Sequence, residues 1–147
     1  MRKIISFLFT LTLLFGCNGA KKEAAYECSE FLDKAYEAFS DANYQVHQAR
    51  SVRDWNGMRS HLQRAMSYCR DAEAYLEMAV NIASDYDSGV VGYSKKGIQY
   101  ARDAYNYANQ AYASSNNTFV DNQTAECLRS ITGGERAIND AKNNLWY

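Results

Sequence analysis

The chain has 147 residues, of which 47% are hydrophobic and 22% are charged, and its formal net charge is -1. This balance excludes a disordered chain, a collagen-like repeat and a strongly basic nucleic-acid-binding protein. Proline is absent and there are 8 glycines, so the chain lacks the turn residues of a many-turned β-sandwich. We therefore predict one domain built from long helices.

The first 17 residues, MRKIISFLFTLTLLFGC, have the form of an export signal. Two basic residues precede an apolar run of about a dozen residues, which is too short for the roughly 20 residues of a membrane-spanning helix. The ending LFGC at residues 14–17 resembles the lipobox of bacterial lipoproteins. The alternative is an ordinary secretory signal that is cut near Gly19 and Ala20.

The lipobox resemblance implies an address and a covalent anchor. It implies that residues 1–16 are removed as a signal peptide and that Cys17 carries acyl chains, which hold a protein durably at a membrane when there are two or more. Because residue 18 is Asn rather than Asp, it also favours the outer membrane of the cell envelope. Residues 17–23 are then the lipidated cysteine and a tether, and residues 24–147 are the folded domain.

The mature chain offers no basic surface for nucleic acid. Without Arg2 and Lys3, the 16 Lys and Arg residues fall to 14, against 17 Asp and Glu, which leaves a net charge of -3. We expect a protein partner and the membrane, and no nucleic acid.

Four segments repeat small or apolar residues at alternating steps of four and three, the heptad pattern of helices that pack as in a coiled coil. We call these positions the seams, and they predict helices over residues 24–53, 57–87, 93–115 and 119–145. The seams are Cys28, Leu32, Ala35, Phe39, Ala42, Val46 and Ala49; Met58, Leu62, Ala65, Cys69, Ala72, Leu76, Ala79, Ala83 and Tyr86; Gly97, Ala101, Ala104, Ala108, Ala111 and Ser115; and Val120, Thr124, Cys127, Ile131, Gly134, Ile138, Ala141 and Leu145.

Short polar links favour antiparallel neighbours, so the predicted fold is an all-α, up-down-up-down four-helix bundle with Ala-rich heptad seams. Asp54 or Asn56 is expected to cap the second helix, and Asn117 or Thr118 the fourth. The competing architecture is a two-helix solenoid, suggested by a similar stretch at residues 68–75 and 100–107.

The first two predicted helices are longer than the third, so we expect the hairpin that they form to protrude by nearly two turns. Its end would be apolar and aromatic and would be a candidate partner-binding site, because Trp, Tyr and Met are enriched at interface centres. The alternative is that this end packs on the start of the fourth helix, around Phe119. The candidate binding residues, which we call the tip, are Tyr44, His47, Trp55, Met58, His61 and Leu62.

The titratable residues give little support for catalysis. Cys28, Cys69 and Cys127 lie on seams, so we expect three buried, reduced thiols. The two histidines have no acidic residue or Cys three or four positions away, so we predict neither a metal site nor a cofactor. Two carboxylate pairs at helical spacing, Asp33 with Glu37 and Glu73 with Glu77, are typical of a solvated surface.

Thr132-Gly133-Gly134-Glu135 is a glycine-rich stretch inside a predicted helix, where each Gly costs about 1 kcal/mol relative to Ala. Close helix packing at Gly134 explains it better than a phosphate cradle, which needs a strand before it and a helix after it.

These patterns together predict a non-enzymatic envelope lipoprotein whose helical bundle binds or scaffolds proteins. Two alternatives remain open: an immunity or inhibitor lipoprotein that holds an antagonist at the membrane, and a bundle that encloses a small apolar ligand. Close-packed alanine seams argue against the last, because they leave little cavity.

Overall fold

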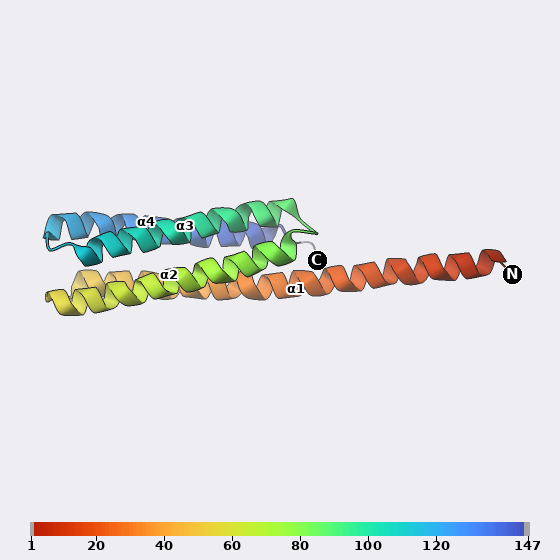
Figure 1. Ribbon diagram of the computed structural model, residues 1–147, viewed down its shortest axis with the longest axis horizontal. Helices are drawn as coiled ribbons and strands as arrows, with labels where there is room; N and C mark the ends of the chain where they lie inside the picture. The colour runs from red at the N-terminus through yellow and green to blue at the C-terminus, as the bar shows by residue number, and fades with distance from the viewer. Residues whose placement is uncertain (1, 146–147) are drawn as a thin grey trace.

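The computed structural model describes residues 2–145, with side chains from residue 19 onward, and within that range the chain forms four helices and no strand. They are α1 (Arg2–Ser51), α2 (Trp55–Ala83), α3 (Ser88–Ala113) and α4 (Asn117–Asn143). Figure 1 shows the helices side by side, and α1 and α3 each lie against both α2 and α4. The predicted all-α helical bundle is confirmed.

Helices α2, α3 and α4 begin earlier than predicted, each directly after its capping residue. The Asp54 side chain accepts a hydrogen bond from the Gly57 amide, as expected, so α2 begins at residue 55. Asp87 caps α3, so residues 88–92, predicted to be a link, form its first turns. The prediction for α4 was wrong by one residue, because Asn116 accepts from the amide of Phe119.

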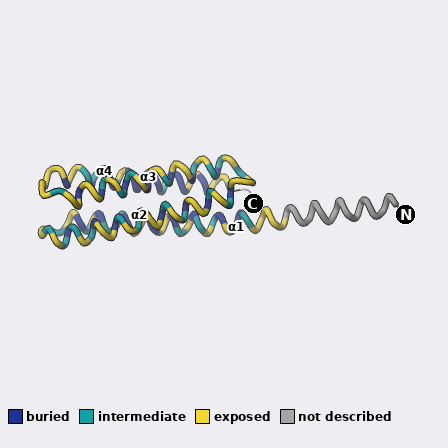
Figure 2. Tube along the Cα trace, in the orientation of Figure 1, coloured by how far each residue is buried: buried dark blue, intermediate teal, exposed yellow. Residues whose placement is uncertain are grey.

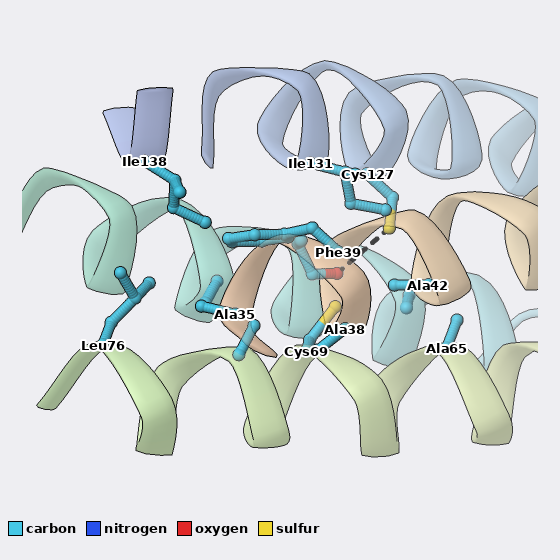
Figure 3. Packing of buried hydrophobic residues seen from close by; sticks show 14 of the residues in the cluster. Ala35, Ala38, Phe39, Ala42, Ala65, Cys69, Leu76, Cys127, Ile131 and Ile138 are labelled. Atoms are coloured by element: carbon cyan, nitrogen blue, oxygen red, sulfur yellow. Dashed lines mark hydrogen bonds between the residues drawn. The ribbon is translucent and has the colours of Figure 1, made fainter. Parts of the chain in front are cut away.

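The bundle interior consists mainly of small side chains around a few large ones. Figure 2 shows buried positions recurring along all four helices. Among them are the seam alanines of α2 and α3, which are fully buried. Figure 3 shows the ring of Phe39, the largest fully buried side chain, close to Ile131 and Ile138 of α4. The two glycines on the seams lie against large side chains, Gly134 against Phe39 and Gly97 against Leu76.

The predicted protrusion of the α1–α2 hairpin is wrong. Leu76 of α2 lies against Gly97 of α3. Because α3 begins earlier, it reaches further along α2, and Arg59 near the start of α2 donates to the carbonyl of Tyr112. Figure 1 shows the two connections at this end of the bundle, α1–α2 and α3–α4, almost level with each other.

The predicted signal peptide and the side chain of Cys17 lie outside the residues described with side chains. Residues 19–23 are exposed and belong to α1, so the segment expected to be a tether is helical here. No helical stretch among the described residues is long and apolar enough to cross a membrane.

Candidate functional site

The structure divides the predicted tip between the core and the surface. Leu62 and Met58 are buried, and Trp55 is partly buried against the core. These apolar residues therefore stabilise the end of the bundle. The surface of the tip is formed by Tyr44, which is 59% exposed, and by His47, which is also exposed.

His61 is held on the side of the tip by a neighbouring helix. Its Nδ1 lies 2.8 Å from Oε1 of Gln45 on α1. This contact links α1 to α2 and accounts for the partial burial of the ring. The described residues include no group of three or more His, Cys, Asp or Glu that could hold a metal ion.

A pocket of about 310 Å³ lies at the same end of the bundle, between the end of α1, the α1–α2 link and the start of α4. We call it the end pocket. Buried residues form its floor and exposed polar or charged residues form most of its rim. It is lined by Ala49, Arg50, Val52, Arg53, Met58, Asn117, Val120, Asp121 and Thr124.

The end pocket exists because α4 covers the tip. Val120, on the first turn of α4, is 5% exposed, and Met58 of α2 is 8% exposed. The hydroxyl of Thr124, one turn further along, donates to the Asp121 carbonyl at 3.0 Å, so this floor side chain satisfies its polar group locally. Met58 of the tip and Val120 at the start of α4 therefore line one pocket, whereas Phe119, around which the alternative expectation placed this packing, is 41% exposed.

The two predicted carboxylate pairs take part in ion pairs between helices. Arg102 of α3 bonds both Glu73 and Glu77 of α2, at 2.6 and 3.4 Å. Asp33 of α1 pairs with Lys142 of α4. Three of the four carboxylates therefore have a cation on another helix as their partner. Each of these ion pairs is at least partly exposed, so each contributes little to stability.

The three thiols of the folded domain are free and buried, as predicted. Burial raises the pKa of Cys28 to about 11 and of Cys127 to about 12, and it also raises the pKa of Cys69. The Cys127 thiol donates to the carbonyl of Ala104 at 3.3 Å, the dashed line in Figure 3. Because a thiol must lose its proton to act as a nucleophile, burial and the raised pKa disfavour reaction of all three thiols at neutral pH.

Gly133 lies in an open depression between α3 and α4. A Cβ at Gly133 would lie 2.6 Å from the ring of Tyr100, which packs directly on the helix backbone. The depression is lined by Tyr100, Leu128, Arg129, Thr132, Gly133 and Arg136. Both adjacent glycines are therefore explained by ring packing, and the predicted close approach at Gly134 is correct.

The predicted tip and the end pocket lie at the same end of the bundle, but the prediction did not include the charged residues of the pocket. The predicted tip consists mainly of apolar and aromatic residues, and it does not include Arg50, Arg53 or Asp121. The available signal was two arginines three positions apart where the first helix ends. Comparison with protein-family models, with curated proteins and with solved structures gave no match.

Proposed function

We propose that this protein is a lipid-anchored bacterial envelope lipoprotein whose bundle serves as a non-enzymatic protein-binding or scaffolding module. The anchor is Cys17 of the LFGC sequence, and the outer membrane is its expected location. The observation that carries the binding role is the end of the bundle furthest from residue 19. There, exposed Tyr44 and His47 lie on α1, and the end pocket opens where α1 and α2 meet α4.

The finer architecture belongs to this proposal: an antiparallel, up-down-up-down bundle with Ala-rich heptad seams. It is supported by the short connections, by the fully buried alanines and by the contacts of each helix with two neighbours. A packed, rigid bundle suits a scaffold because its surface residues keep fixed positions relative to one another.

The chemistry of the described residues supports a non-enzymatic role. The thiols are buried and protonated, and three of the spaced carboxylates form ion pairs with cations of other helices. Ion pairs between helices and buried thiols are typical of structural rather than catalytic groups.

The anchor is tested by membrane fractionation of a Cys17→Ser variant. We expect the variant to leave the membrane fraction, because the lipid acceptor is lost. An Asn18→Ser variant, changed at the neighbouring residue, is the matched control and should stay with the membrane. If Cys17→Ser fractionates like the wild type, the lipoprotein proposal is wrong.

The binding role is tested by crosslinking in intact cells that produce the protein, followed by co-purification. A Tyr44→Ala, His47→Ala double variant removes exposed side chains without opening the core. We expect it to lose a partner that the wild type captures, whereas Tyr36→Ala, at an exposed tyrosine of the same helix outside the tip, keeps it. An empty capture by the wild type would contradict the scaffolding role.

A further inference from the structure

The end pocket combines an apolar floor with a charged rim, which a simple packing defect would not require. Ala49, Met58 and Val120 on its floor are 2%, 8% and 5% exposed. Its volume of about 310 Å³ is at the lower end of the range for small-ligand sites. A ligand of this pocket would place an apolar group on the floor and a polar group at the rim.

The rim has two arginines whose guanidinium groups are not engaged by the protein. Within the described part of the chain, neither Arg50 nor Arg53 takes part in a salt bridge or side-chain hydrogen bond. Arg50 lies in the last turn of α1, where a cation also interacts favourably with the helix dipole, but Arg53 lies beyond that helix. The second arginine therefore has no structural role in the helix.

The net charge of the rim residues indicates which ligand charge would bind best. Two arginines and Asp121 leave one net positive charge, which matches a monoanion. The Asp121 carboxylate repels a dianionic phosphate more strongly than it repels a monoanion. Arginine forms bidentate hydrogen bonds with carboxylates and with phosphates, so the single net positive charge is what favours a carboxylate at this rim.

We propose that the end pocket binds the C-terminal carboxylate of a partner polypeptide, with the partner's apolar last side chain on the floor of Met58 and Val120. Capture of a free chain end is a known mode of peptide recognition, and it requires a carboxylate next to one side chain, as this pocket offers. The amide side chain of Asn117 lies on the same rim and can bond the peptide backbone. This inference deepens the proposed function and rests on it, because it names the part of the partner that is recognised.

The test measures the binding of short peptides to the full chain in detergent micelles. Fluorescein-labelled Gly-Ser-Gly-Leu, Gly-Ser-Gly-Val and Gly-Ser-Gly-Phe are titrated by fluorescence anisotropy, each with a free carboxylate and as the C-terminal amide, and empty micelles are subtracted. We expect the free acids to bind with a Kd of about 1 mM or lower and the amides to bind at least about tenfold more weakly. Equal binding of acids and amides, or no binding by any peptide, would overturn the proposal.

Variants place the binding in the end pocket. Arg50→Gln with Arg53→Gln should weaken binding of the free acid about tenfold, and Asp121→Asn should strengthen it about twofold by removing a negative charge. Arg64→Gln changes an exposed arginine of α2 that does not line the pocket, and it should bind like the wild type. A double variant that binds like the wild type would overturn the assignment of the pocket.

Unlabelled 4-methylpentanoate distinguishes the source of the carboxylate. If it competes as strongly as unlabelled Gly-Ser-Gly-Leu, the pocket recognises a small acid and the polypeptide proposal is wrong. The crosslinking test of the proposed function uses Tyr44 and His47, which do not line the pocket, so the two tests can fail separately.

Discussion

The contact between Phe39 and Gly134 predicts that a single added methyl group destabilises the bundle. A Cβ on residue 134 would lie 2.3, 2.5 and 2.8 Å from three carbons of the Phe39 ring. The ring is fully buried, so it cannot move into solvent. Overpacking of this kind costs about 1–3 kcal/mol, whereas replacing a helical Gly by Ala gains about 1 kcal/mol. With the cost near its upper end, Gly134→Ala should lower the free energy of unfolding by about 2 kcal/mol.

Two other glycines provide matched comparisons. Gly92 of α3 is exposed and has no atom within 4 Å of an added Cβ, so Gly92→Ala should stabilise the protein by about 1 kcal/mol. Gly133→Ala also meets a ring, but Tyr100 is 39% exposed and can swing outward. The Gly133 variant should therefore melt between the other two.

Thermal melting followed by circular dichroism measures all three variants on the full chain in mild detergent. For a domain of this size, 1 kcal/mol corresponds to roughly 3 °C in Tm, so Gly134→Ala should melt about 6 °C below the wild type and Gly92→Ala about 3 °C above it. A double variant with Phe39→Leu should reduce the penalty at residue 134. If Gly134→Ala melts at or above the wild-type temperature, the packing of α1 on α4 described above is wrong.

Three further predictions concern the core and the titratable groups. Ala108→Leu should cost about 1–3 kcal/mol by overpacking a fully buried position, whereas Ala113→Leu, at the exposed end of α3, should change stability by less than about 0.5 kcal/mol in urea unfolding. Burial raises the pKa of Glu135, so the charged carboxylate is disfavoured in the folded state. The folded protein is therefore more stable below the unfolded pKa of about 4.3, where Glu135 is protonated, and it loses that stability as the pH rises and the residue ionises. Glu135→Gln should therefore stabilise the protein at pH 7 and lose that advantage near pH 4; an equal effect at both pH values would contradict this reasoning. The three buried thiols should resist a disulfide reagent in the folded protein and react fully in denaturant, and fast reaction of the folded protein would show that the core is open.

Helix number and core positions could be predicted from the sequence because they depend on local periodicity. Cys28 to Ala49 on the first seam and Met58 to Ala83 on the second are buried as the heptad pattern required. Tyr86, at the end of the second seam, is 39% exposed because α2 has already ended at Ala83. The pattern fixes which face is buried but does not fix where a helix stops.

The register between helices could not be predicted, because it depends on the precise length of each link. The stretch after Asp87 contains Gly89 and Gly92 and was interpreted as a loop, yet the Asp87 side chain accepts hydrogen bonds from the amides of Gly89 and Val90 and starts a helix. Because of that difference of a few residues, α3 reaches further along α2 than predicted. The start of α4 then lies beside Met58 and forms the end pocket, whereas Tyr44 and His47 of the tip stay exposed.

The unbroken course of α1 fixes the distance between residue 19 and the far end of the bundle. From residue 19 to Ser51 the helix continues without interruption, which at 1.5 Å per residue is about 50 Å. If Cys17 is held in a lipid leaflet, the end pocket stands at a set height from that leaflet. Partners would then be sorted by geometry as well as by chemistry, because only a chain end that projects to this height can enter the pocket. Lengthening or shortening α1 before residue 24 by whole turns would change which partners are within reach.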